Sequence, residues 1–168
     1  LARNALTATG RRRRVFDPRG RAPAMDDETP TTDGGADQTT TPADTHGLDP
    51  VVRRAEDVDY EGTDAAPGLR KGVLVGEGEG APNLAIRRFT LDAGASVPKH
   101  TNEVEHEQYV LEGSYTVGIG EEEHEVSAGD SLFIPAGTVH WYRNEGDDPG
   151  AFLCAVPNGD DEIQLLDA

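Results

Sequence analysis

Cysteine and long apolar runs are scarce in this sequence. Cys154 is the single cysteine among 168 residues, so no disulfide can form within one chain. The richest apolar runs, such as residues 73–75 and 152–156, are strand-sized, whereas a membrane-spanning helix needs about 18 consecutive apolar residues. We therefore expect no membrane span, and the lone cysteine favours a reducing, cytoplasmic compartment.

Lysine is also rare. Only Lys71 and Lys99 occur beside 13 arginines and 32 acidic residues, and the net charge is −17. Residues 1–24 hold seven arginines against Asp17, so the rest of the chain carries 31 acidic residues against eight basic ones. Such a surface repels phosphate backbones and anionic lipid, which excludes nucleic acid and membrane as expected partners and favours a small-molecule ligand. The balance resembles that of proteins from salt-loving archaea.

The chain divides into three stretches by composition. Residues 1–24 end before Met25, the only methionine, so we interpret this Arg-rich leader as the product of an upstream translation start. Residues 25–66 are rich in Asp, Thr, Gly and Pro and poor in aliphatic side chains, which predicts an acidic disordered tail. Residues 67–168 are predicted to form one domain.

Short apolar and β-branched runs separated by glycine follow residue 67, without a sustained helical period. They predict an all-β fold whose strands close into a barrel or form two facing sheets, because either arrangement protects strand edges. The expected strands cover residues 72–76, 84–91, 107–111, 115–119, 122–126, 131–134, 139–143 and 152–156.

A first block, GASVPKHTNEVEHEQYVLEG at residues 94–113, contains two histidines, His100 and His106, with Asn102 between them. Alternate side chains of an extended chain share a face. The three residues are therefore predicted to point to one side and Glu107 to the other.

A second block, GDSLFIPAGTVHWYRN at residues 129–144, contributes another histidine. Pro135 and Gly137 frame a turn that delivers His140 at the start of a strand. A third imidazole is thus available to a site on the inner face.

These two blocks resemble the two cupin motifs. The second matches its pattern of Gly, five residues, Pro, one residue, Gly, two residues, His, three residues and Asn at every named position. The likeness covers residues 81–157 and is strongest to small single-domain cupins of archaea and bacteria. It implies a small double-stranded β-helix, or jelly-roll, barrel, and it implies a homodimer because cupins often pair through their sheets.

The resemblance also implies a metal site. Four histidines bind the metal in that subfamily, and their pattern maps onto His100, Asn102, His106 and His140. Asn102 departs from the family, because its carbonyl oxygen is a poorer ligand for borderline metals than an imidazole nitrogen. The broader cupin pattern instead takes a Glu ligand, which here is Glu107, so this residue stays an alternative.

Three imidazoles with an open coordination position suit manganese, iron, copper, nickel or zinc. We expect a metal-binding protein with a dioxygenase-like activity on a small polar molecule. A non-catalytic module that binds or senses a small ligand or metal is the alternative, and a sugar isomerase or epimerase is less favoured. Isomerisation of an anionic sugar needs basic side chains, for which Arg87, Arg88 and Arg143 are the candidates, with Arg143 predicted to face solvent.

The remaining candidates have plainer interpretations. His46 and His124 are predicted to be solvated, and Cys154 to be a buried packing residue. Aromatic side chains are expected to fill the barrel or cap its mouth, namely Tyr109, Phe133, Trp141 and Tyr142.

Overall fold

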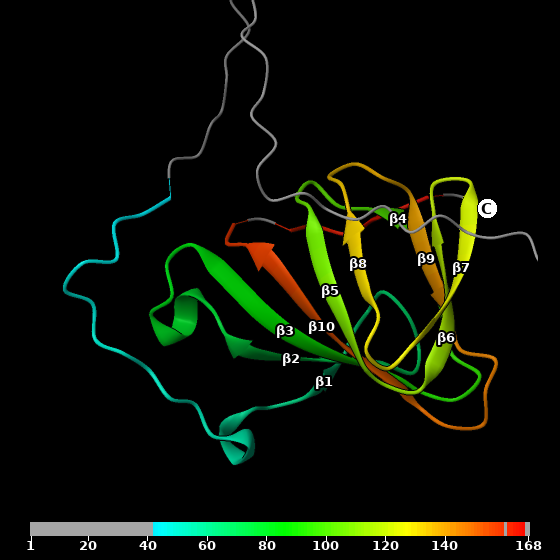
Figure 1. Ribbon diagram of the computed structural model, residues 1–168, viewed down its shortest axis with the longest axis horizontal. Helices are drawn as coiled ribbons and strands as arrows, with labels where there is room; N and C mark the ends of the chain where they lie inside the picture. Colours follow the sequence, from blue (N-terminus) through cyan, green and yellow to red (C-terminus); the bar gives the residue numbers. More distant parts are fainter. Residues whose placement is uncertain (1–41, 160, 167–168) are drawn as a thin grey trace, which may run out of the picture. The chain divides into compact units, whose positions relative to one another are not determined.

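The structure is a computed structural model that describes residues 42–159 and 161–166 (Figure 1). The predicted leader, residues 1–24, and the predicted tail as far as residue 41 lie outside these ranges. The elements in chain order are η1 (Ala55–Asp57), β1 (Glu61–Gly62), β2 (Leu69–Val75), η2 (Glu77–Glu79), β3 (Leu84–Leu91), β4 (Ser96–Thr101), β5 (His106–Glu112), β6 (Ser114–Ile119), β7 (Glu122–Ser127), β8 (Ser131–Ile134), β9 (His140–Arg143), β10 (Gly150–Pro157) and β11 (Gln164–Leu165).

Two antiparallel sheets face each other. One has the strand order β1-β2-β3-β10-β5-β8 and the other β11-β4-β9-β6-β7. In Figure 1, β3, β10, β5 and β8 run side by side, and β4, β9, β6 and β7 form the other wall. The predicted all-β jelly-roll architecture is confirmed. None of the helical segments in the described ranges has the length and apolar character that a membrane span requires.

Aromatic rings tie the two sheets together. Phe152 on β10 stacks on Tyr142 on β9 of the opposite sheet, with 5.3 Å between ring centroids. It also stacks on Phe89 on the neighbouring strand β3, at 5.1 Å. Leu91 and Val110 are fully buried in the same core. Since burying one such side chain contributes about 1.5–3 kcal/mol, this core holds the strands firmly in register.

All eight predicted strands are present, with ends that differ by at most three residues. The sequence did not reveal β4 as a strand, although β4 carries His100. Only Val97 among its residues is a buried aliphatic side chain, and Pro98 interrupts the alternation, so the usual strand signal is weak. The two-residue strands β1 and β11 are too short to predict.

Residues 42–66, which fall within the predicted tail, make defined contacts with the barrel. They belong to the same compact unit as the barrel, and β1 pairs with β2. Arg53 donates a hydrogen bond from Nη1 to the carbonyl oxygen of Val73 at 2.9 Å and pairs with Glu79. The Tyr60 ring lies over Gly72, where no Cβ blocks its approach. Contacts with the barrel thus begin ahead of residue 67, and composition alone does not reveal them.

Side-chain parity corrects the prediction for two aromatic residues. The even-numbered positions of β5 point inward, so Tyr109 on the outer face is 47% exposed. Phe133 on the adjacent β8 is 56% exposed. Tyr142 is buried as predicted, and Trp141 is half-buried.

Candidate metal centre

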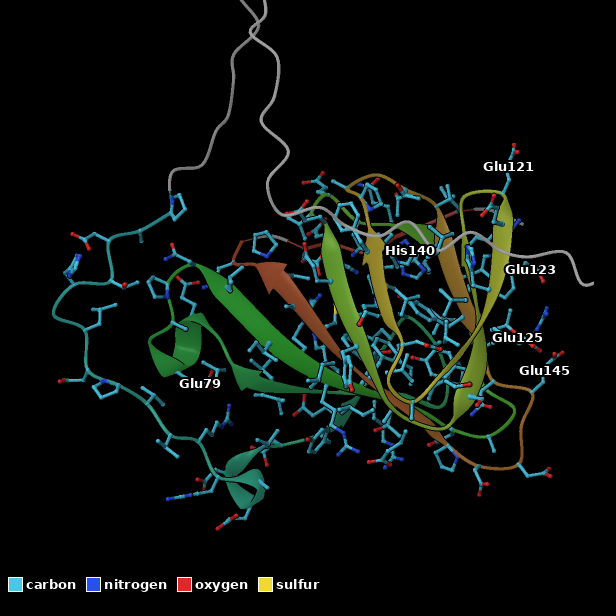
Figure 2. All side chains as sticks on the ribbon, viewed as in Figure 1. Glu79, Glu121, Glu123, Glu125, His140 and Glu145 are labelled. Atoms are coloured by element: carbon cyan, nitrogen blue, oxygen red, sulfur yellow. The ribbon has the colours of Figure 1, made fainter. Side chains whose placement is uncertain are left out.

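The four candidate ligands from the two sequence blocks line one cavity. His100 lies near the end of β4, Asn102 just after it, and His106 and His140 at the starts of β5 and β9. All four side chains are buried. They share a cavity of about 740 Å³ between the sheets. Figure 2 shows His140 inside the barrel, whereas Glu123 and Glu125 on β7, and Glu121 in the turn before it, point away from it.

The strand register brings the histidines together. His100 and His140 are direct cross-strand partners in the β4–β9 pair. Their ring centroids lie 4.1 Å apart, and the His106 and His140 centroids lie 5.6 Å apart. Residues separated by 40 positions in the sequence therefore form one cluster of three imidazoles.

Backbone carbonyls fix the orientation of two rings. His100 Nδ1 donates to the carbonyl oxygen of Pro98 at 2.8 Å, and His140 Nδ1 donates to that of Thr138, also at 2.8 Å. A carbonyl can only accept, so Nδ1 carries the proton in each ring and Nε2 keeps its lone pair. Metal-ligating histidines are usually held in this way.

Two buried acceptors at this cluster have no hydrogen-bond partner within the described residues. They are Nε2 of His140 and Oδ1 of Asn102. A buried polar atom without a partner costs about 1–3 kcal/mol, so such atoms in a well-packed interior indicate a missing partner. Both atoms are of types that ligate divalent transition metals.

A carboxylate that the sequence did not single out also lies at the cluster. Oδ1 of Asp161 accepts a hydrogen bond from Nδ2 of Asn102 at 2.7 Å and lies 3.4 Å from Nε2 of His106. Its Oδ2 accepts from Nη1 of Arg87 at 2.6 Å. Asp161 follows β10 and is held near the site by β11, which pairs with β4. Nothing in the sequence distinguishes Asp161, one of 32 acidic residues, as a residue of the site.

The charges of the histidines differ. Burial lowers the pKa of His140 to about 4, an effect to which His100 adds, and burial also lowers the pKa of His100. Burial alone would lower the pKa of His106 too, but its hydrogen bonds to Asp161 and Cys154 raise that pKa to about 9. Near neutral pH, His100 and His140 are therefore neutral and His106 is a cation.

The Asp161 carboxyl is the counterpart of that cation. Burial would raise its pKa, but the hydrogen bonds from His106 and Arg87 hold the pKa well below its usual range. His106 and Asp161 thus form an ion pair in the metal-free protein, with Arg87 as a second cation on the same carboxylate. In keeping with this pairing, no three His, Cys, Asp or Glu side chains in residues 42–159 and 161–166 form a ready-made metal-binding group.

Glu107, the alternative ligand, lies elsewhere. It is exposed on the outer face of β5, opposite Phe133 of β8, and does not line the cavity. The even-numbered neighbours His106 and Gln108 take the inward positions, as strand parity predicts. His124 is exposed as predicted.

A second group of polar side chains extends the cavity beyond the histidines. Nε2 of Gln108 donates to the Tyr142 hydroxyl at 2.6 Å, and the buried Cys154 thiol lies 3.6 Å from Nη2 of Arg87. Arg87 therefore faces inward, and it shares the cavity wall with Cys154, which both packs in the core and lines the cavity. Arg143 is partly exposed and pairs with the exposed Glu145, in agreement with the prediction that it faces solvent.

Comparisons with known proteins show what this domain is similar to. Residues 87–156, which include all four candidate ligands, match the family model described as Cupin domain. Among solved structures, the chain is similar to the polyketide cyclase RemF from Streptomyces resistomycificus, with 27% identity over 70% of this chain and 87% of that chain and a TM-score of 0.64. No curated protein sequence matches the chain.

Two further structures share the fold. A cupin 2 conserved barrel domain protein from Rhodopseudomonas palustris has 26% identity over 66% of this chain and 79% of that chain, with a TM-score of 0.58. An RmlC-like cupin from Shewanella frigidimarina has 21% identity over 64% of this chain and 89% of that chain, with a TM-score of 0.55. Residues 87–156 therefore resemble a cupin domain in sequence, as the two motifs predicted, and the fold resembles that of solved cupins. Its origin in a salt-loving archaeon stays a prediction.

Proposed function

We propose that this cupin domain binds one divalent transition-metal ion through His100, Asn102, His106 and His140 and uses it to transform a small polar molecule. The observation that carries the proposal is the pair of buried, unpartnered acceptors, Nε2 of His140 and Oδ1 of Asn102, beside the imidazole of His100. Manganese, iron, copper, nickel and zinc all accept this set of nitrogen and oxygen ligands.

A cation suits the cluster better than a water molecule does. A water donates only two hydrogen bonds, whereas the Nε2 atoms of His100 and His140 and the Oδ1 of Asn102 offer three acceptors in one buried cluster. His106 would join as the fourth ligand once its proton is lost and its contact with Asp161 is given up. Metal uptake is then expected to release a proton, as it does wherever a protonated ligand is displaced.

The residues around the centre give the cavity both apolar and polar surface. Phe89, Val97 and Phe152 offer an apolar surface, and Arg87 and Gln108 offer polar groups that orient a ligand. A cavity of about 740 Å³ falls in the range of small-molecule sites. When bound, a metal of this class supplies Lewis acidity, and iron, copper or manganese can in addition support oxygen chemistry. The residues that line the cavity would position the substrate beside the bound ion.

Two kinds of chemistry compete for this site. A dioxygenase-like reaction consumes oxygen, whereas cyclisation or isomerisation proceeds by proton transfer without an oxidant. The similarity to a polyketide cyclase at 27% identity favours the second kind as an alternative. Measuring oxygen uptake while the metal-loaded protein converts a substrate separates the two, because only the dioxygenase-like reaction consumes oxygen. A non-catalytic ligand-binding module would bind small molecules without turnover in either assay.

Metal analysis of the purified protein after loading tests the proposal. We expect one metal ion per chain in the parent protein and in His124→Ala, because His124 is an exposed histidine on β7 away from the cavity. His140→Ala should bind far less metal. A parent protein that cannot be loaded with any of the five metals would rule the proposal out.

The predicted homodimer belongs to the same proposal. Ile86 on β3 and Phe133 on β8 are exposed in one cross-strand row on the outer face of the six-stranded sheet, with Glu107 between them. Pairing through this face would cover these apolar side chains. A molar mass measured by light scattering that matches one chain would contradict it.

A further inference from the structure

The Arg87 guanidinium is a buried cation whose counterion comes from a distant segment. Its side chain is 12% exposed, and that of Asp161 is 9% exposed. The two residues are 74 positions apart in the sequence. A buried charge without its partner is strongly destabilising, so Arg87 requires a carboxylate or an equivalent anion wherever the chain is folded.

The donors around this carboxylate form a subsite. Nη1 of Arg87 donates to one oxygen of Asp161, and Nδ2 of Asn102 donates to the other, which also lies next to Nε2 of His106. Three donors from β3, β5 and the end of β4 therefore surround both oxygens of one carboxylate. Nε of Arg87 is also buried and has no partner within the described residues. Arg87 thus keeps one donor that Asp161 does not use.

The segment that supplies the carboxylate is held much less firmly than the donors. β11 has only two residues, and both are exposed. Leu165 and Leu166 are 54% and 42% exposed, and Ile163 is 41% exposed. Short, solvent-exposed pairings of this kind open at low free-energy cost compared with core strands. The donors stay in place when such a segment moves, because their strands belong to the packed barrel.

From this asymmetry we infer that Arg87 and Nδ2 of Asn102 form an anion subsite for the carboxylate of a small organic acid, to which Nε2 of His106 adds a donor only while no metal is bound. Asp161 fills this subsite until such a ligand displaces the segment 161–166. The remainder of the ligand would lie along Phe89 and Phe152 and reach toward His100 and His140, which line the same cavity. The inference names a ligand class for the proposed function, and its catalytic meaning rests on that function. Carboxylate binding itself does not require the metal.

Asp161 competes with free carboxylates for the subsite, and this competition sets the expected change in benzoate affinity. A tethered carboxylate acts at a local concentration of about the millimolar range or higher, so free carboxylates bind the parent protein weakly. Asp161→Asn keeps the side-chain size but removes the charge, and benzoate should then bind at least about tenfold more tightly than to the parent chain. Benzamide, the neutral analogue of benzoate, should gain nothing.

The test is calorimetric titration of benzoate into chelator-treated protein. Glu162→Gln is the matched control, because Glu162 is an adjacent exposed carboxylate that makes no contact with Arg87, and its benzoate affinity should equal that of the parent. The double variant Arg87→Gln/Asp161→Asn should lose benzoate binding. Equal benzoate affinities for Asp161→Asn and the parent chain, or no binding to either, would overturn the inference.

Hydrogen exchange on the parent chain covers the case in which Asp161→Asn fails to fold. The Leu166 amide donates to the carbonyl oxygen of Lys99 at 3.0 Å, and saturating benzoate should speed its exchange as the segment leaves. Unchanged exchange across residues 161–166 with benzoate bound would also overturn the inference. Since all of these measurements use metal-free protein, failure to load a metal would count against the proposed function and leave this inference standing.

Discussion

The two sides of the candidate centre are held by different means. His100 and His140 each donate to a backbone carbonyl two residues earlier in the chain. Asn102 and His106 instead contact the side chain of Asp161, 59 and 55 residues away. The first side is therefore preformed by the strands themselves. The second depends on a carboxylate that a metal or a ligand can displace, so a change of state at the site should be visible mainly there.

The largest expected effect comes from removing the preformed side. His140→Ala deletes the imidazole that lies closest to His100 and carries an unpartnered Nε2. We expect metal affinity to fall by about 100-fold or more, since a lost ligand costs more than the 10- to 100-fold typical of an outer-shell change. His106→Ala should cost less, because that ring must first give up Asp161.

Competition titration with a chromophoric chelator measures both affinities under one set of conditions. His124→Ala provides the matched control on β7. A larger loss for His106→Ala than for His140→Ala would contradict the division of the centre into a preformed and a displaceable side.

Alkaline pH should disrupt the ion pair between His106 and Asp161, on the displaceable side of the centre, in the metal-free protein. The pKa of His106 is raised from 6.5 to about 9, so its pairing with Asp161 stabilises the fold fully below pH 6.5 and is lost as the pH rises toward 9. The loss amounts to at most about 3 kcal/mol, because one pKa unit corresponds to about 1.4 kcal/mol. Above pH 7.5, His100 and His140 are neutral in both states and do not obscure it.

Urea unfolding at pH 7.5 and pH 9.5 measures this change. Asp161→Asn lacks the charge that holds the proton on His106, so its stability should vary much less over the same interval. At the acid end, the lowered pKa of Asp161 has the opposite sign, and the stability from its charge is lost as the pH falls below the carboxyl's ordinary range. A parent protein whose stability is constant from pH 7.5 to 9.5 would show that the ion pair does not form.

Asn102→His should sharpen the comparison by strengthening the displaceable side. It replaces an amide oxygen with an imidazole, the ligand that the cupin pattern has at this position, and removes a hydrogen-bond donor to Asp161. We expect metal to bind about tenfold more tightly, because imidazole is the better ligand for this class of metals. An unchanged or weakened affinity in the same chelator competition would indicate that Asn102 does not lie in the coordination shell.

The smallest effect is expected on the outer face. Glu107→Gln alters a side chain that is exposed and does not line the cavity. Metal affinity should stay within about twofold of the parent value, because exposed charges at this distance are screened by solvent. A large loss would reinstate Glu107 as a ligand.

Local patterns in the sequence were enough to predict most of the fold and four of the side chains that line the site. Alternation along residues 100–106 and the turn before His140 placed four side chains in one cavity, since strand parity follows from backbone geometry. The positive φ of 71° at Gly137 is part of that turn, and glycine adopts it without strain.

The positions of Asp161 and Arg87 at the site could not be predicted, because they depend on contacts between distant segments. Asp161 lies in a short acidic stretch like many others in this chain, and β11 has two residues, so neither the carboxylate nor its pairing with β4 leaves a pattern. The inward position of Arg87 follows from the β3–β10 register, in which it lies opposite Cys154. A sequence shows which residues can share a face, but not which distant charge will meet them there.

X-ray absorption at the metal edge of the loaded protein tests the central claim most directly. We expect one metal per chain, with three imidazole nitrogens and at least one oxygen at about 2.0–2.2 Å, and the loss of one imidazole in His140→Ala but none in His124→Ala. A shell with fewer than two imidazoles, or one that His140→Ala leaves unchanged, would contradict it.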